Sequence, residues 1–356
     1  MPGERLGERP RVVTLKDVAR AADVHISTAS RSLDPAKAGR LSYETVKRVR
    51  RIAAELGYSP DMVARGLKRG RTTTIGVVVA DLENPFVGPV IRGIAGALEE
   101  HGFVALVAET LDDPDRFARL LDHLVSRRVD AIIATAARYG DGPLLKRASR
   151  LGPPIVLAVR SLPHSALPTV VPDDTLGATL AVDHLHQLGH RVCAQLKGAL
   201  DISSFVDRSR AFEQRMTGLG LRNVSVLESA RSPTIAEGRR LMELTLAATD
   251  RPTAIFAHND LLAVGAIDAI RASGLDCPRD ISVFGFNDGP LADHVSPALS
   301  TIRMPLLELG RRAAGLAMEL IEHPAAGPRR ISFAPALVLR ASTGPAPVLT
   351  GGGTAS

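Results

Sequence analysis

The stretch TLKDVARAADVHISTASRSL, residues 14–33, decides the architecture of the front of the chain. Thr14 followed three residues later by Asp17 is a capping box, which marks the start of a helix. Four apolar residues then recur at helical spacing: Leu15, Val18, Ala19 and Ala22. A second short helix, about Ser27 to Leu33, follows after a brief interruption. Two short helices joined by so tight a turn cross steeply, with Val24 wedged between them, so the stretch predicts a helix-turn-helix.

The second helix carries the side chains that we expect to contact DNA. Small groups beside one long donor suit the major groove, and the predicted exposed set is Ile26, Ser27, Ser30 and Arg31. Ser27, Arg31 and Ile26 are expected at base edges. Lys16 and Thr28 are expected to position the phosphate backbone, and Thr14 completes the candidate set.

A third helix completes this module. Ser42 caps it, and it runs through Leu56 to Gly57 in the C′ position. Its predicted buried face consists of five apolar residues: Val46, Val49, Ile52, Ala53 and Leu56. Four basic residues lie elsewhere on the helix and can touch phosphates: Lys47, Arg48, Arg50 and Arg51.

Charge is distributed unevenly along the 356 residues. Residues 1–71 hold 16 Lys and Arg against 8 Asp and Glu, whereas the rest of the chain holds 28 against 30. A basic block joined to a near-neutral body indicates a polyanionic partner, although a solvated basic tail is the alternative on charge alone. Two cysteines exclude a disulfide scaffold, and no apolar run is long enough for a membrane helix. The charged N-terminus lacks the apolar core of a secretory signal, so a cytoplasmic protein is expected.

From Thr74 onward, short β-branched runs alternate with helical patterns. The predicted strands are 75–80, 104–107, 131–134 and 155–159 in the first half, and 192–197, 224–227, 254–257 and 281–286 in the second. Strands separated by helices of about 12 to 15 residues form parallel sheets flanked by helices. Two such halves leave a cleft at the strand carboxyl ends, where ligands bind in this architecture. The predicted class is α/β, with a helix-turn-helix headpiece and a two-lobed domain.

The chain resembles the LacI/GalR family of bacterial transcription regulators. The resemblance rests on Thr14-Leu15-x-Asp17-Val18-Ala19-x-x-Ala22-x-Val24-x-x-x-Thr28-x-Ser30-Arg31 and Glu55-Leu56-Gly57-Tyr58-x-Pro60, and on later blocks such as Asp173-Asp174-x-x-Gly177-Ala178. It implies two periplasmic-binding-protein-like subdomains joined by three crossovers, and a homodimer that binds a pseudo-palindromic operator. The chain departs at Asp23, His25 and Ala29, where the family usually has Gly, Ser and Val, which leaves the operator sequence open.

Residues 61–72 form a short basic linker between headpiece and body. Gly66 and Gly70 each cost about 1 kcal/mol of helix propensity. The resemblance implies that this hinge becomes helical only on the operator, with Leu67 inserted between base steps in the minor groove and Arg65 on the backbone. A passive linker is the alternative.

The expected division of the chain follows from these patterns and the resemblance. The headpiece is 13–60, the hinge segment is 61–72 and the effector-binding domain is 73–343. Crossovers expected near Ser161, Pro297 and residue 325 give lobe one as 73–161 and 298–325, and lobe two as 162–297 and 326–343. Residues 1–12 and 344–356 are expected to be disordered tails.

The resemblance places five residues around a small polar effector: Phe86, Arg160, Arg208, Asn259 and Asn287. Arg208 would be a forked donor to ligand oxygens, Asn287 an acceptor, and Phe86 an apolar lid. No aromatic residue occurs in the segment 231–234, where sugar and purine regulators often stack the ligand. A purine would lose about 0.5–1.5 kcal/mol of stacking there, which favours a sugar or sugar-like polyol and leaves other classes open.

No catalytic site, metal site or cofactor is expected. The chain contains no P-loop, nucleophile elbow or CxxC motif. His184, His186 and His190 cluster in the sequence, but the fuller HExxH zinc pattern is absent.

Together these features predict a sequence-specific DNA-binding transcriptional regulator, expected to be a repressor, whose operator affinity changes with cleft occupancy. A sugar-binding receptor shares the body fold, but it would need an export signal and has no use for residues 14–67. No leucine heptad follows Thr343, so no assembly beyond the dimer is expected. Whether the effector releases or promotes DNA binding stays open.

Overall fold

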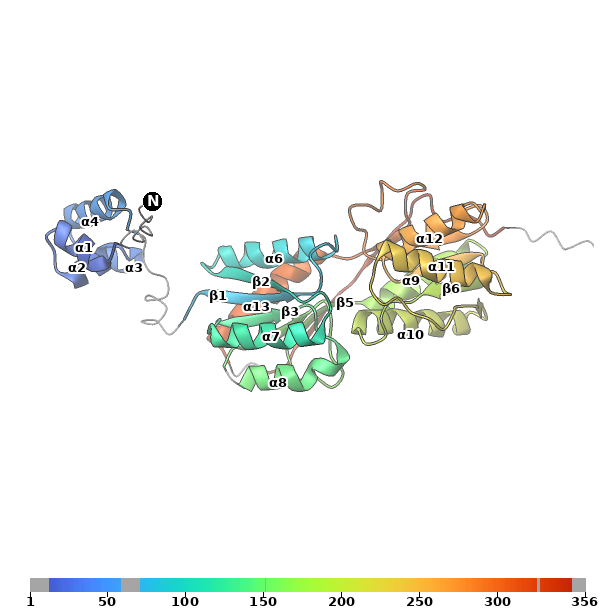
Figure 1. Cartoon of the computed structure of the whole chain (residues 1–356), viewed down its shortest axis with the longest axis horizontal. Coiled ribbons are helices and arrows are strands. Elements are labelled where there is room, and N and C mark those ends of the chain that lie inside the picture. Colours follow the sequence, from blue (N-terminus) through green and yellow to red (C-terminus); the bar gives the residue numbers. More distant parts are fainter. Residues whose placement is uncertain (1–12, 59–70, 151, 325–326, 348–356) are drawn as a thin grey trace, which may run out of the picture. The chain divides into compact units, whose positions relative to one another are not determined.

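The computed structural model describes residues 13–58, 71–150, 152–324 and 327–347 (Figure 1). By its internal contacts the chain divides into two units, Met1–Thr72 and Thr73–Ser356. No helix within the described ranges is both long and apolar enough to cross a membrane.

The first unit is a small helical module. Its helices are α1 (Leu15–Ala21), α2 (Ile26–Ser32), α3 (Pro35–Ala38) and α4 (Tyr43–Glu55). The carboxylate of Asp17 accepts hydrogen bonds from the backbone N–H of Thr14 (3.0 Å) and from its hydroxyl (2.6 Å), so α1 begins where the capping box predicts. Ser42 caps α4 by accepting from the backbone N–H of Thr45 (3.3 Å), and Gly57 follows the helix with φ of +65°. The single turn of α3 was not predicted because four residues carry no periodicity.

The core of this module forms where its helices meet. It holds six buried residues: Val18, Ala19, Ala22, Ala29, Val49 and Ala53. Val24 packs against this core from the turn, as predicted. Leu56, predicted on the buried face of the third helix, is instead 39% exposed, because it is the C-cap residue beyond the last turn. Asp23 in the turn has φ of +49°, a left-handed conformation that glycine adopts more readily.

The first lobe of the second unit is built on a six-stranded sheet with the order β11-β5-β4-β3-β1-β2, in which all neighbours pair in parallel. Its strands are β1 (Thr74–Val79), β2 (Val104–Glu109), β3 (Ala131–Ala134), β4 (Ile155–Ala158), β5 (Thr169–Pro172) and β11 (Arg330–Phe333). Its helices are α6 (Val87–Glu99), α7 (Pro114–Ser126), α8 (Gly142–Arg150) and α13 (Leu306–Glu322), with a 3-10 turn at Tyr139–Asp141. Alternate residues of β1 pack on opposite faces, Val77 in the core with α6 and Val78 in the core with α7, and these two helices flank the sheet in Figure 1.

The second lobe is built on a four-stranded parallel sheet with the order β7-β6-β8-β9. Its strands are β6 (Val192–Leu196), β7 (Arg222–Asn223), β8 (Ala254–Ala257) and β9 (Ser282–Phe284). Its helices are α9 (Asp174–Gln187), α10 (Ser203–Gly218), α11 (Ile235–Ala247) and α12 (Asp260–Ala272). The two parallel sheets with flanking helices confirm the predicted α/β class.

One predicted strand of this lobe is displaced. The sequence predicts a strand at 224–227, but β7 ends at Asn223. Beyond it, the Ser225 hydroxyl accepts the backbone N–H of Gln195 (2.8 Å), and Asn223 Oδ1 accepts the backbone N–H of Ser225 (3.0 Å). Side-chain oxygens therefore take the place of the backbone ladder at this point.

Two segments expected in the second lobe belong to the first. β5 pairs with β4, and β11 pairs with β5. The expected crossovers near Ser161 and residue 325 are therefore wrong, because the chain leaves the first sheet only after Pro172 and after Phe333. The middle crossing follows Pro297, at β10 (Thr301–Arg303), which forms an antiparallel ribbon with β12 (Ala336–Val338). Periodicity identifies a strand but not the sheet that it joins, since pairing is non-local.

The expected C-terminal tail begins too early. Residues 344–347 of the predicted tail at 344–356 are described and pack on the second lobe. The backbone N–H of Ala346 donates to the carbonyl oxygen of Leu188 (2.8 Å), and that of Gly344 donates to the Ser282 hydroxyl (3.1 Å). Residues 1–12 and 348–356 lie outside the described residues.

Gly93 of α6 lies where α13 approaches most closely. A Cβ atom at Gly93 would lie 2.1 Å from the carbonyl oxygen of Leu307, whereas one at Gly96 would have no neighbour within 4 Å. We expect Gly93→Ala to lower the free energy of unfolding by about 1–3 kcal/mol. Gly96→Ala on the same helix should raise it by about 0.5–1 kcal/mol through helix propensity. Urea unfolding of both variants measures these changes. If Gly93→Ala and Gly96→Ala have the same free energy of unfolding, the close contact at Gly93 is contradicted.

Candidate DNA-contacting face and effector cleft

The exposed face of α2 is organised around Ser27. Its backbone N–H donates to Nδ1 of His25, the N-cap residue (3.3 Å), and its hydroxyl lies 2.8 Å from the same ring nitrogen. One turn later, Nε of Arg31 donates to the carbonyl oxygen of Ser27 (3.2 Å), and a terminal nitrogen donates to the hydroxyl (3.3 Å). Arg31 is exposed, so its guanidinium is held beside Ser27 with N–H groups left for an external acceptor. His25, a departure from the family pattern, acts here as a helix cap.

The other candidate residues of α1 and α2 differ in exposure. Thr14 and Lys16 are exposed, and Thr28 is half-buried. Ser27 and Ser30, which were expected to be exposed, are also half-buried. Ile26 was expected on the exposed face, but it is half-buried and packs against the headpiece core. The sequence pattern misplaced it because the first residue of a helix can turn toward the preceding helix.

Two further positions qualify the predicted interface. Ala29 is fully buried, so this departure from the family pattern changes the core and not the contact face. Arg65 and Leu67 of the expected hinge lie outside the described residues.

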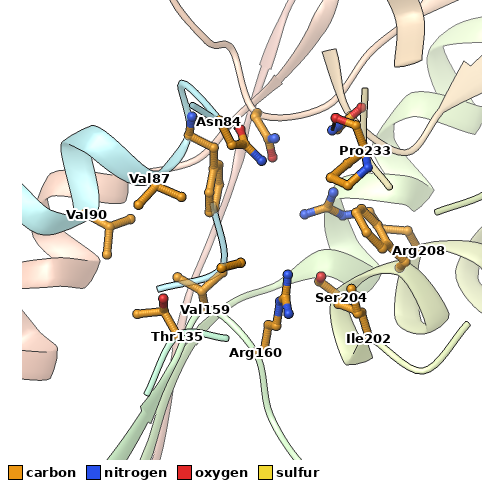
Figure 2. A pocket seen from close by; sticks show the side chains of 15 residues that line it. Asn84, Val87, Val90, Thr135, Val159, Arg160, Ile202, Ser204, Arg208 and Pro233 are labelled. Atoms are coloured by element: carbon orange, nitrogen blue, oxygen red, sulfur yellow. Dashed lines mark hydrogen bonds between the residues drawn. The ribbon is translucent and has the colours of Figure 1, made fainter. Parts of the chain in front are cut away.

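Both lobes contribute to one cleft of about 590 Å³, part of which is open to solvent. All five residues expected around an effector line it: Phe86, Arg160, Arg208, Asn259 and Asn287. In Figure 2 the guanidinium groups of Arg208 and Arg160 project into the cleft. That these residues contact an effector stays a prediction.

Arg208 is the most deeply buried charge of this wall. Only 3% of the residue is exposed, and its Nε and one terminal nitrogen both lie 2.8 Å from Oδ1 of Asp174. The other terminal nitrogen donates to the carbonyl oxygen of His258, and the guanidinium stacks 3.7 Å from the ring centre of Phe286. Burial raises the pKa of Asp174 to about 6. The charge and the hydrogen bond of Arg208 lower this pKa, but the effect of burial is larger. Burial likewise lowers the pKa of Arg208.

His258 supports Arg208 from behind, a role that the sequence did not indicate. Its Nδ1 accepts the backbone N–H of Gly198 (3.1 Å), so the proton resides on Nε2, which lies 2.9 Å from Oε1 of Gln195. Burial, followed by the charges of Arg208 and Lys197, holds the pKa of His258 well below its ordinary value. The imidazole is therefore neutral and fixes the carbonyl that receives Arg208.

The two asparagines of the cleft differ in their hydrogen bonds to the rest of the protein. Oδ1 of Asn259 caps α12 by accepting the backbone N–H of Leu262 (2.8 Å). Asn287 has φ of +121°, and its buried Oδ1 has no hydrogen-bond partner among the described residues. Asn287 lines the cleft, so its side-chain amide is a candidate partner for the polar groups of a ligand.

Arg160 is also paired within the protein. One terminal nitrogen lies 2.6 Å from Oδ1 of Asp112 and the other 3.3 Å from Oδ2, and the carbonyl oxygen of Ala136 accepts a further bond (3.0 Å). Arg160 is 8% exposed and lines the cleft, whereas Asp112 lies behind it.

Sequence reasoning missed part of the cleft wall. Ile202, Ser204, Phe205 and Thr135 also line the cleft. Phe205 stacks on His258 with ring centres 6.0 Å apart. Segment 231–234 contributes Pro233 to the cleft and no aromatic side chain, but Phe205 lies one helical turn before Arg208 and shares its face. The cleft therefore offers an aromatic surface to a flat-ringed effector.

Comparison with known proteins identifies the family. "Bacterial regulatory proteins, lacI family" matches residues 14–61, and "Periplasmic binding protein-like domain" matches residues 182–343. The transcriptional repressor CytR of Escherichia coli (strain K12) is 30% identical over 333 residues, which cover 93% of this chain and 96% of the relative. The chain belongs to the LacI family. It is a DNA-binding transcriptional regulator with an effector-binding domain, as the sequence predicts.

Further relatives of this LacI-family chain agree over its length. The transcriptional regulator DegA of Bacillus subtilis (strain 168) is 32% identical, over 93% of this chain and 98% of the relative. The Lac repressor dimer bound to operator and the anti-inducer ONPF superposes with a TM-score of 0.84 at 25% identity, covering 94% of this chain and 100% of that chain. A complex of the transcriptional regulator CelR with cellobiose superposes with a TM-score of 0.70 at 27% identity. The match covers 93% of this chain and 99% of that chain.

The lobes of this LacI-family regulator are joined beside the cleft by an ion pair. Nε and a terminal nitrogen of Arg138, which follows β3, each donate to a different carboxylate oxygen of Asp201, which precedes α10 (2.7 Å each). The backbone N–H of Tyr139 also donates to the carbonyl oxygen of Asp201 (2.9 Å). Burial opposes the ionised form of Asp201, but the hydrogen bond and charge of Arg138 outweigh it and lower the pKa.

A double-mutant cycle on Arg138→Gln and Asp201→Asn should show this coupling. The bidentate geometry predicts an interaction free energy of about 0.5–2 kcal/mol in urea unfolding. The exposed pair Arg222–Asp250 within the second lobe, also at 2.7 Å, is the matched control. We expect it to contribute about 0.2–1 kcal/mol or nothing measurable. A coupling at Arg138 no larger than in that control would contradict the assignment.

The histidines noted in the sequence are occupied by other partners. Nε2 of His184 lies 3.0 Å from the Thr343 hydroxyl, and Nδ1 of His190 lies 2.9 Å from the Thr253 hydroxyl. Within the described ranges, no three His, Cys, Asp or Glu side chains gather as metal ligands would.

Proposed function

We propose that this regulator is a cytoplasmic homodimeric repressor that acts without catalysis and binds a pseudo-palindromic operator. A small polar effector, sugar or sugar-like, would bind in the cleft and set its operator affinity. The observation that carries the proposal is the cleft wall, to which both lobes contribute, with Arg208 and Asn287 from the second lobe and Phe86 from the first. The relatives support it, since the Lac repressor dimer is bound to operator and CelR to cellobiose.

The coupling would work through the separation of the lobes. An effector held by Arg208 and Asn287 of the second lobe and by Phe86 of the first is bound best when both lobes enclose it. It therefore favours one arrangement of the cleft. A ligand that prefers one arrangement by about 1–3 kcal/mol changes operator affinity about 5- to 150-fold.

DNA recognition would combine base contacts with phosphate contacts. Ser27 and Arg31 are proposed at base edges because they lie together on the open face of α2. The exposed basic residues of α4 are proposed at phosphates. Arg65 and Leu67 are proposed at the backbone and the minor groove.

The edge of the first sheet is the proposed dimer surface. β2 is the terminal strand of that sheet, and its side chains include Val104, Leu106 and Val107, which are 65%, 37% and 37% exposed. A row of open apolar side chains along a sheet edge is a liability unless a partner covers it. A second copy of this chain is the occupant that a two-fold operator requires.

A second chemical class of effector is also a candidate. Phe205 supplies an aromatic surface in the cleft wall, which favours a non-sugar effector with a flat ring. Thermal-shift screening of neutral sugars against nucleosides separates the two classes.

Selection from a random DNA duplex pool tests the proposed function. Full-length protein at about 150 mM salt should enrich a pseudo-palindrome, because two headpieces related by two-fold symmetry contact two half-sites. Arg31→Ala protein carried through the same rounds is the control. Salt-sensitive retention without any enriched sequence would count against a sequence-specific repressor.

A further inference from the structure

Both cationic side chains in the described part of the cleft wall are already neutralised by partners outside it. Arg208 pairs with Asp174 at 2.8 Å, with 3% and 5% of the two side chains exposed. Arg160 pairs with Asp112 at 2.6 Å. Neither aspartate lines the cleft, so each cation meets a ligand with its charge compensated from behind.

The surroundings of Arg208 are more acidic than its single ion pair suggests. The carboxylates of Asp174, Asp260 and Asp207 all act on its charge and oppose the lowering of its pKa by burial. The carboxylate of Asp260 already accepts hydrogen bonds from the Thr301 hydroxyl (2.6 Å) and from the backbone N–H of Gly289 (2.7 Å). A negatively charged group in this part of the cleft would lose its hydration and meet no free positive charge.

From these pairings we infer that the effector is an uncharged molecule and that Asp174 excludes phosphorylated and carboxylated analogues. Asp174 is a positioning residue, because it acts on the ligand only through the guanidinium of Arg208. The remaining N–H groups of Arg208 can still donate to a neutral oxygen. The inference rests on the proposed effector role of the cleft.

The same wall defines what the neutral ligand must offer. Asn287 presents an amide group in the cleft wall, so a ligand with at least one hydroxyl or N–H group at that end is favoured. Val87, Val90, Ile202 and Phe205 supply apolar surface, so the ligand also presents a carbon face. Sugars and nucleosides without phosphate combine these properties.

Inorganic sulfate is the probe that tests the exclusion of charge. Full-length Asp174→Asn keeps the shape of the aspartate but leaves Arg208 with an uncompensated charge. The double variant Asp174→Asn/Arg208→Met removes both partners and measures sulfate bound elsewhere, including on the basic headpiece. At pH 8 and constant ionic strength, calorimetry should show sulfate binding to D174N at least about tenfold tighter than to wild type or to the double variant.

Two further variants keep the test decisive. Asp183→Asn breaks an ion pair with Arg215 (2.5 Å) that joins the same helices, α9 and α10, away from the cleft, and it should bind sulfate as wild type does. If D174N does not fold, Asp112→Asn frees Arg160 in the same way, and asparagine tolerates its φ of +53°. A loss of packing alone would not increase the affinity for sulfate.

Two results of these sulfate measurements would contradict the inference. Wild type that binds sulfate more tightly than the double variant would overturn the inference, as would a folded D174N without any gain. Neither measurement involves operator DNA, so failure here is distinct from failure of the duplex selection.

Discussion

Replacement of Arg208 by alanine is expected to lower the free energy of unfolding by about 3–5 kcal/mol, in addition to abolishing the effector response. The cost arises because Asp174, 5% exposed, is left as a buried carboxylate without its cation, and the carbonyl of His258 loses a donor. DNA binding without effector should stay intact, because Arg208 lies in the cleft wall. The structure adds a stability cost, measured by urea unfolding monitored by circular dichroism.

The pH dependence of the Arg208→Ala cost distinguishes its cause. In wild type the pKa of Asp174 is raised to about 6, so native-state stability from this group falls as the pH rises through that value. Without the charge and hydrogen bond of Arg208, both of which lower it, the pKa rises further. The variant therefore protonates Asp174 more readily, and its deficit should be smaller at pH 5 than at pH 8.

The matched control removes both members of the pair. Asp174→Asn/Arg208→Met leaves no buried charge, so it should recover most of the lost stability. A deficit that is equal at pH 5 and pH 8, or a double variant as unstable as Arg208→Ala, would show that lost packing and not an unpaired carboxylate causes the effect.

Arg31→Ala should weaken operator binding by on the order of 10²–10⁴-fold, because each headpiece loses a base contact of about 1–3 kcal/mol and a dimer has two. Arg31 is exposed and held by Ser27, so its removal should leave the headpiece folded. Fluorescence anisotropy with the selected duplex and with a scrambled duplex measures the specificity ratio, which should fall with the affinity.

Arg51→Ala is the control for general electrostatics. Arg51 is an exposed residue of α4 that pairs with Glu55 (2.7 Å). Its loss should weaken binding to both duplexes alike and reduce the salt slope by about 2, because a dimer loses one phosphate contact in each headpiece. If Arg31→Ala instead behaves like Arg51→Ala, Arg31 contacts phosphate and not a base.

The headpiece was largely predictable because its signals are local. The capping box of Thr14 and Asp17, the cap at Ser42 and the stop at Gly57 each depend on residues within one helical turn. Ile26 and Leu56 were misplaced, both at helix ends, where periodicity defines direction least well. The body was predictable as alternating strands and helices, but not in its crossovers, because β5 and β11 join the first sheet through pairings between segments far apart in sequence.

The cleft shows the same division between local and distant information. The sequence named five of its wall residues because strand ends and helix starts recur at fixed places in this family. It did not predict the Arg208–Asp174 and Arg160–Asp112 pairs, which join residues 34 and 48 positions apart. Those pairs set the charge of the site, so the sequence named the donors without showing that they were already neutralised.

Binding of a ligand in the cleft and binding of the operator are expected to be thermodynamically linked. The dissociation constant of the selected operator is measured with and without a saturating neutral ligand that stabilises wild type in a thermal-shift screen. We expect the dissociation constant to change about 5- to 150-fold in either direction, with the same factor when ligand affinity is measured with and without operator. An operator affinity that is identical with the cleft filled and empty would contradict it.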